Sequence, residues 1–175
     1  MANREALRDL QSRLSGRLQA ARNEGVQVAA WLAVQAGGRG YLLPLSQSGE
    51  IFPWTGVQPV PYTKPWFLGI ANLRGTLSGV ADLAELLGHA CPRSEVQLAE
   101  SSLLGLNAAL EVNAALLVDK LQGLRAASDF VHAERPKETA SAFLGPVHVD
   151  ASGQHWQELN LQQLSQAAEF LNIRA

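Results

Sequence analysis

The chain has 175 residues, of which 47% are hydrophobic, and a chain of this length buries about 70% of its unfolded surface as one domain. Its 14 Lys and Arg residues nearly balance 16 Asp and Glu residues, so no overall field attracts nucleic acid or anionic lipid, and proteins of those classes are disfavoured. The single cysteine, Cys91, cannot form a disulfide within the chain, and this cysteine usage suits the cytosol.

Residues 1–24 have the pattern of an amphipathic helix. Leucines recur at spacings of three and four, and the arginines lie off that stripe. The stripe consists of Leu7, Leu10, Leu14 and Leu18. The segment lacks the apolar core of a secretory signal, and no stretch of the chain reaches the roughly 20 apolar residues of a membrane helix. We therefore expect a cytoplasmic protein with no direct membrane insertion.

The next part of the chain is predicted to form a hairpin and a long, ordered connection. Apolar residues alternate from Val26 to Val34, which is typical of a strand. Glycines follow directly and favour a tight reversal, so residues 26–45 are predicted to form a β-hairpin. Residues 47–65 are rich in Pro and Gly and leave room for a short strand at residues 50–54.

The middle of the chain is predicted to contain a turn or bulge at residues 73–76 and a short buried strand at residues 77–81. Asp82 has the position of a helix N-cap, and a glycine stop follows it, so a helix of one to two turns is expected. The polar residues 91–101 are predicted to form a loop that is extended at residues 95–99.

The C-terminal half is predicted to consist mostly of strands. The expected strands are residues 103–106, 108–112, 114–118 and 121–124, and a last hairpin of residues 143–149 and 155–159. The polar residues 129–140 are expected to form a surface loop. Asn160 has the position of an N-cap, which predicts a terminal helix over residues 160–172. Many short strands at spacings near ten residues favour a barrel or sandwich over a parallel sheet.

No group of residues in the sequence has the pattern of a catalytic or metal site. His148 and His155 could meet across the last hairpin, but zinc would need a third ligand. The pentapeptide at residues 75–79, GTLSG, differs from a nucleophile elbow because its central residue is leucine. Asp82 and Asp119 each have a local role, as a helix cap and in a turn at the end of a strand. We therefore expect no enzyme activity, no metal and no cofactor.

Two tryptophans, Trp54 and Trp66, lie in the Pro-rich connection beside Pro53 and Pro65. Trp is enriched in interface hot spots, and this connection offers less core in which to bury so large a side chain. Core packing and partner binding are therefore equal alternatives for both residues.

Two blocks of sequence resemble a known family. In the first block, residues 65–75 read PWFLGIANLRG and residues 80–88 read VADLAELLG; in the second, residues 115–124 read ALLVDKLQGL. In this order they resemble the CheW-like coupling domains of bacterial chemosensory systems. The PWF triplet and the Gly-Leu-Arg at residues 123–125 resemble the branch of the family that serves type IV pilus twitching motility (PilI-type). The resemblance spans most of the chain.

The resemblance implies a mainly β fold of two intertwined five-stranded SH3-like barrels, to which the sequence patterns above add an N-terminal and a C-terminal helix. A CheW-like domain is then expected over residues 25–175, closing with the helix at residues 160–172. Members of the family are adaptors without catalytic activity. The implied partners are the cytoplasmic tip of a chemoreceptor (a methyl-accepting chemotaxis protein) and the regulatory domain of a CheA-type histidine kinase. The implied location is the cytoplasmic array at the inner membrane face.

The resemblance also implies which residues bind partners. Arg74, in the Asn-Leu-Arg-Gly motif, is expected on the receptor-facing side, and its guanidinium beside a glycine suits a carboxylate or backbone carbonyls of a partner. The internal alternative is a salt bridge from Arg74 to Asp82 or Glu50. The candidate partner-binding residues are Ser46, Gln47, Glu50, Ile51, Trp54, Trp66, Asn72, Arg74 and Gly75.

The alternative function is a stand-alone small β-barrel that binds a ligand or an oligonucleotide. Single-strand binders need a basic groove with exposed aromatic side chains. The chain is 6% aromatic and carries a net charge of -2, so its composition favours the adaptor.

Overall fold

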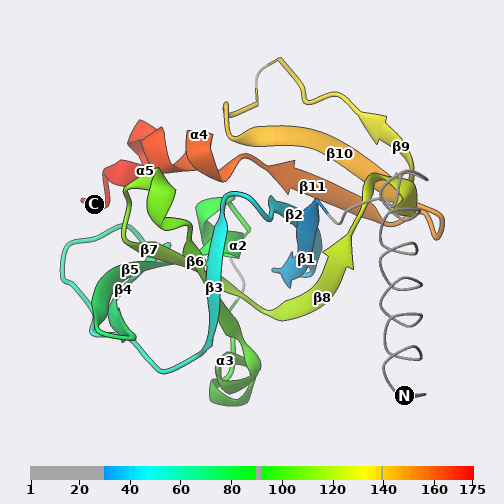
Figure 1. Ribbon diagram of the computed structural model, residues 1–175. Coiled ribbons are helices and arrows are strands. Elements are labelled where there is room, and N and C mark those ends of the chain that lie inside the picture. Colours follow the sequence, from blue (N-terminus) through cyan, green and yellow to red (C-terminus); the bar gives the residue numbers. More distant parts are fainter. Residues whose placement is uncertain (1–29, 90–91, 139) are drawn as a thin grey trace, which may run out of the picture.

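The computed structural model describes residues 30–89, 92–138 and 140–175 (Figure 1). The amphipathic helix predicted over residues 1–24 lies outside the described residues. Within these ranges, every helix is too short or too polar to cross a membrane. The described chain forms two β-sheets and several short helices.

One sheet has six strands in the order β8-β1-β2-β11-β10-β9. Its strands are β1 (Trp31–Ala36), β2 (Arg39–Pro44), β8 (Lys120–Arg125), β9 (Phe130–Glu134), β10 (Leu144–Asp150) and β11 (His155–Leu159). The pairing of β2 with β11 is parallel, and the other pairings are antiparallel. The ring of Trp31 on β1 lies 6.0 Å from that of Phe130 on β9. Because β1 and β9 lie near opposite ends of the strand order, this contact shows that the sheet curls.

The other sheet has five strands in the order β3-β6-β7-β5-β4. Its strands are β3 (Ser48–Pro53), β4 (Phe67–Leu73), β5 (Thr76–Asp82), β6 (Ser102–Leu106) and β7 (Ala114–Val118). The β5–β7 pair is parallel, so the carboxyl ends of these two strands lie side by side. That edge holds the buried ion network described below.

The two sheets are intertwined because the chain passes between them twice. It leaves the six-stranded sheet after β2, at residues 45–47, and returns to it between β7 and β8, at Asp119. A polar side chain in each of these two connections forms a hydrogen bond to the backbone of a distant segment. Gln47 Oε1 accepts from the backbone N–H of Leu161 at 2.7 Å. Asp119 Oδ2 accepts from the backbone N–H of Gly37 at 2.7 Å. The predicted mainly β, intertwined fold is confirmed, with six strands in one sheet where five were expected.

Strand β9 contradicts the prediction of a surface loop over residues 129–140. Phe130–Glu134 pairs antiparallel with β10 at the edge of the six-stranded sheet. Most of its side chains are exposed, so the polar composition that suggested a loop reflects an edge strand that buries little surface.

Short helices lie between the strands and after the last strand. They are α2 (Leu83–Leu86), α3 (Glu95–Glu100), α4 (Leu161–Gln166), α5 (Ala168–Leu171) and the 3-10 helices η1 (Ala108–Leu110) and η2 (Ala127–Asp129). Asp82 caps α2 as predicted, accepting from the N–H of Ala84 at 3.0 Å. The extended piece predicted at residues 95–99 is wrong, because Ser94 and Gln97 form a reciprocal capping box that starts α3.

Two further predictions of regular structure are wrong. The strand expected at residues 108–112 is the 3-10 helix η1, which Asn107 caps and which ends at Glu111 with a left-handed φ of 58°. The helix expected over residues 160–172 is interrupted at Ala167, whose ψ of 128° is extended and separates α4 from α5. Neither the apolar run at residues 108–112 nor the Asn160 cap with the apolar residues that follow it is sensitive to such local backbone changes.

The main core lies between the two sheets. It contains Val34, Tyr41 and Leu43 of the six-stranded sheet, Leu104, Leu116 and Val118 of the five-stranded sheet, and apolar side chains of α2, α4 and α5. A smaller cluster around Trp156 packs on the other face of the six-stranded sheet, and one around Leu117 on the other face of the five-stranded sheet. Both sheets therefore contribute side chains to one shared core.

Candidate functional site

The β4–β5 hairpin holds the first candidate residues in a tight turn. Arg74 and Gly75 both have positive φ, 50° and 87°, which a two-residue type I′ turn requires at both central positions. Asn72 Oδ1 accepts from the backbone N–H of Gly75 at 2.7 Å and so braces the turn. The next residue but one, Leu77, is 66% exposed, so the strand expected to be buried is exposed where it begins.

Arg74 forms an ion pair with Glu50 across the curled sheet. Glu50 belongs to β3 and Arg74 to the β4–β5 turn, so the pair joins the two end strands of the five-stranded sheet. The two side chains are 75% and 45% exposed, and the Arg74 guanidinium lies 6.0 Å from the centre of the Phe52 ring. The internal salt bridge proposed as an alternative therefore exists, to Glu50, but it is exposed.

A groove of about 360 Å³ lies beside this ion pair. Its walls come from β3, from the β4–β5 hairpin, and from residues at the ends of β6 and β7. Gly49 allows β3 to approach β6 closely, because a Cβ at this position would lie 2.8 Å from the carbonyl oxygens of Gly105 and Leu106. The closely packed strands β3 and β6 therefore form one side of the groove, and the exposed Arg74 lies on the other side.

The other candidate residues divide between surface and interior. Ile51 is 41% exposed on β3, and Trp54 is half-buried against the cluster around Leu117. Trp66 is 8% exposed, and its ring stacks on that of Phe170 at 5.8 Å. Core packing is therefore the role that the structure supports for Trp66.

Ser46 and Gln47 lie at the first passage between the sheets. The Ser46 carbonyl accepts from Asn107 Nδ2 at 3.4 Å, and Gln47 Oε1 accepts from two backbone N–H groups at the start of α4. The structure thus brings together Glu50, Asn72, Arg74 and Gly75, and it gives Gln47 a structural role.

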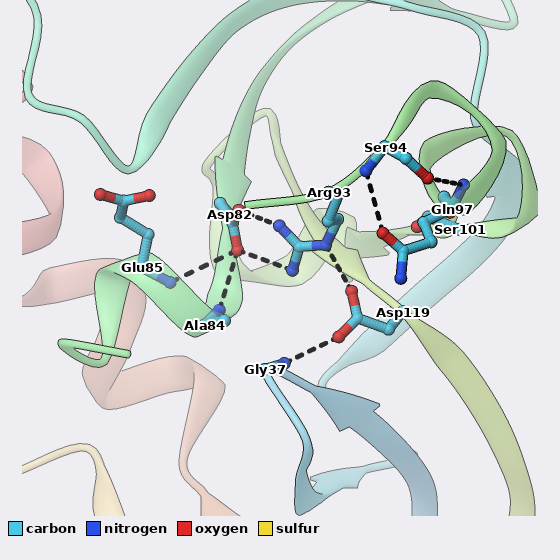
Figure 2. A network of polar contacts seen from close by, with 9 residues as sticks. All are labelled: Gly37, Asp82, Ala84, Glu85, Arg93, Ser94, Gln97, Ser101 and Asp119. Carbon is cyan, nitrogen blue, oxygen red and sulfur yellow. Dashed lines mark hydrogen bonds and ion pairs between the residues drawn. The ribbon is translucent and has the colours of Figure 1, made fainter. Parts of the chain in front are cut away.

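A buried ion network was missed by the sequence interpretation (Figure 2). Arg93 binds Asp82, with one bond of 3.2 Å between Nη2 and Oδ1, and its Nε donates to Asp119 Oδ1. The side chains of Arg93 and Asp82 are only 6% and 5% exposed. Burial favours a lower pKa for Arg93, but its hydrogen bonds to Asp82 and Asp119 outweigh that effect, so the pKa of Arg93 is raised. The guanidinium stays charged.

A sequence signal for this network existed. Asp82 ends β5 and Asp119 directly follows β7, and residues at the carboxyl ends of adjacent parallel strands lie close together. The two aspartates were assigned separate local roles because the parallel pairing was not predicted. Arg93, in the segment interpreted as a loop, is the cation that joins them.

Within the described ranges, no group of three or more His, Cys, Asp and Glu side chains is placed to hold a metal. His148 and His155 do not meet, because His148 pairs with Trp156 and His155 with Val149. The His148 ring instead contacts Glu158 Oε2 at 2.7 Å and lies 5.1 Å from the rings of both Trp31 and Phe130. Its side chain is only 12% exposed, so His148 is mostly buried.

Comparison with known proteins agrees with this architecture. A CheW-like domain is recognised over residues 30–169. Protein PilI of Pseudomonas aeruginosa is 27% identical over 155 residues, which cover 87% of this chain and 84% of PilI. The crystal structure of the scaffolding protein TtCheW from Thermoanaerobacter tengcongensis matches with a TM-score of 0.61 at 18% identity, covering 74% of this chain and 87% of that one.

The domain match extends over both sheets and most of the chain, and the structural match shows the same fold. CheW-like scaffolding proteins are non-catalytic, and the family assignment favours the adaptor over the ligand- or oligonucleotide-binding barrel. The chain belongs to the CheW-like domain family and is a scaffold or adaptor of chemosensory signalling.

Proposed function

We propose that this protein couples a chemoreceptor to a CheA-type histidine kinase in a cytoplasmic array at the inner membrane face, and that the array controls type IV pilus twitching motility. The observation that carries the proposal is the CheW-like domain over residues 30–169. The similarity to PilI over 87% of the chain supports the twitching-motility pathway.

The receptor-facing site of this proposal is the exposed pair of Arg74 and Glu50 with the groove beside it. The type I′ turn presents the Arg74 guanidinium away from the core, with five donors in a rigid fork. Such a fork matches a carboxylate at the tip of a helical receptor. Asn72 and Gly75 contribute by holding the turn, and Ile51 and Trp54 add apolar surface on the neighbouring strand and connection.

Glu50 competes for the same guanidinium in the unbound protein. A receptor carboxylate that docks on Arg74 must displace Glu50 or share Arg74 with it. Removing the Glu50 charge is therefore expected to strengthen receptor binding a few-fold, while removing Arg74 weakens it. A general effect of surface charge would give the same pair of effects, so a cation outside the groove has to be removed as a control.

The experiment measures binding of the full chain to a purified receptor signalling domain and, separately, to a kinase regulatory domain. The variants are Arg74→Ala and Glu50→Gln, with Arg135→Ala as a matched control because Arg135 is exposed and lies outside the groove. Arg74→Ala should weaken receptor binding by about 2 to 5 kcal/mol if the ion pair is desolvated on docking.

Arg135→Ala should leave both affinities unchanged. Binding of neither purified domain by the unmodified chain would refute the coupling function. Receptor binding that is equally strong with Arg74→Ala would instead refute only the assignment of Arg74 to the site.

A further inference from the structure

A second cavity lies on the six-stranded sheet, away from the Arg74 groove. Its volume is about 560 Å³, within the range of roughly 300 to 1,000 Å³ that is usual for small-molecule sites. Its floor is formed by residues of β2, β10 and β11, and Leu87 and His89, which follow α2, form its rim. None of the elements that form the Arg74 groove contributes to it.

The floor residues of this cavity share one face of the sheet. Arg39 and Tyr41 are two apart on β2, so their side chains point to the same side. Tyr41 is paired with Gln157 on β11, and Gln157 is paired with Val147 on β10. The sheet register therefore places an arginine, a tyrosine, an amide and an apolar side chain next to one another.

The cavity favours an anion. Among the described residues that line it, none is Asp or Glu, whereas Arg39, His89 and His155 are all present. Arg39 forms no ion pair with any residue in the described part of the chain. Burial lowers the pKa of His89 and the nearby charge of Arg39 lowers it further, which favours a neutral His89 and leaves Arg39 as the cation of the lining.

The Tyr41 hydroxyl adds a hydrogen-bond donor to the cavity. Tyr41 is 3% exposed, and its hydroxyl is buried with no hydrogen-bond partner among the described residues. A buried polar group without a partner is rare in folded proteins and calls for an explanation. Burial raises the pKa of this hydroxyl, although Arg39 opposes the shift, so it stays protonated and can donate to an anion for which the neighbouring side chains make room.

The rest of the lining is largely apolar. Leu87, Leu144 and Val147 line the cavity together with the Tyr41 ring. Small-molecule sites commonly combine such an apolar lining with a few polar groups that fix orientation. An ion without an apolar part would leave these side chains exposed to water, so a ligand with both parts fits better than an inorganic anion.

We propose that this cavity binds a small amphipathic carboxylate. Arg39 and the Tyr41 hydroxyl bind the carboxylate group, and Leu87, Leu144 and Val147 contact the apolar chain. The site is separate from the Arg74 groove, because the two cavities share no lining residue.

The test uses octanoate as the probe and the full chain labelled with ¹⁵N. Three comparison compounds separate the contributions: octanol has the chain without the charge, octylammonium has the opposite charge, and acetate has the carboxylate without the chain. Titrations followed by amide chemical shifts give both the affinity and the location. Octanoate should produce saturable shifts at residues 39–41, 87–89 and 147, and it should bind at least ten-fold more tightly than each comparison compound.

Two variants test the assigned donors. Arg39→Gln should weaken octanoate binding by ten-fold or more, and Tyr41→Phe, which removes only the unpartnered hydroxyl, should weaken it by about three-fold while the protein stays folded. Arg135→Gln removes the same charge outside the cavity and should leave the affinity within two-fold.

Equal binding of octanol and octanoate would overturn the proposal, as would unchanged octanoate affinity in Arg39→Gln. Shifts centred on the exposed side chains Ile51 and Leu77 would also overturn it, because these lie outside the cavity. Receptor and kinase binding by the same variants reports separately on the coupling function.

Discussion

Asp82 and Asp119 bind the same guanidinium, that of Arg93, although one caps a helix and the other lies between the two sheets (Figure 2). The Asp82–Arg93 pair is almost fully buried. Asp119 also binds the backbone of Gly37 in the β1–β2 turn. One cation thus links the six-stranded sheet, the five-stranded sheet and α2.

Arg93→Ala should destabilise the protein by about 3 to 5 kcal/mol, because it leaves the buried Asp82 and the partly buried Asp119 without their cation. The free energy of unfolding measured by urea denaturation checks this. The control is Arg135→Ala, an exposed position at which a change within about 0.5 kcal/mol is expected. An Arg93→Ala variant as stable as this control would show that the network contributes nothing to stability.

The Arg74–Glu50 ion pair should contribute little to stability, because both side chains are substantially exposed. A double-mutant cycle with Arg74→Ala and Glu50→Ala should give a coupling energy below about 1 kcal/mol. Added salt should reduce it further. A coupling of several kcal/mol would mean that the pair is buried in solution, contrary to the structure.

Gly75→Ala should destabilise the β4–β5 hairpin by about 1 to 2 kcal/mol, because φ is 87° at this position and a side chain disfavours the left-handed region. Thr76→Ala, at the exposed next residue, is the matched control and should have a smaller effect. Thermal melting of both variants makes the comparison. Equal melting temperatures would show that the turn relaxes without cost.

Asp150 should make stability depend on pH below its ordinary pKa of 3.8. Hydrogen bonds from Ser152, Trp156 and the backbone lower its pKa in the folded protein. A carboxyl group whose pKa is lowered by folding stabilises the protein above its unfolded pKa, and this contribution is lost as pH falls toward the folded pKa. Asp150→Asn should therefore destabilise the protein at pH 7 more than at pH 3.

The matched control for Asp150 is Glu138→Gln, which removes a carboxylate at an exposed position. Melting followed by circular dichroism at the two pH values tests both variants. If Asp150→Asn destabilises the protein equally at pH 7 and pH 3, the Asp150 carboxylate does not contribute to the dependence of stability on pH.

Structural features that are determined by residues close together in the sequence were predictable from the sequence. The first and last hairpins and the Asp82 cap follow from turn and cap residues that act within a few positions. Strand β9 was not predictable in this way, because its pairing with β10 is a tertiary contact and its exposed side chains carry no apolar alternation.

The residues of the candidate site also differ in whether nearby sequence or distant contacts determine their positions. The sequence indicated Arg74 and its turn, since Asn72 and Gly75 are local. Glu50 was named only as one of two possible partners, and curling of the five-stranded sheet decides between them. Trp66 lies in a Pro-rich connection, and it is buried in the main core, where its ring stacks on Phe170 of α5 from the far end of the chain.

The two passages of the chain between the sheets constrain the order of folding during synthesis. Strands β1 and β2 leave the ribosome first, but their partners β8 and β11 follow only after the entire five-stranded sheet. Pairing between distant segments is slow and leaves strand edges exposed meanwhile. A chain cut between β2 and β3 would separate strands of the same sheet, so we expect neither fragment to fold alone and unfolding to be a single cooperative event.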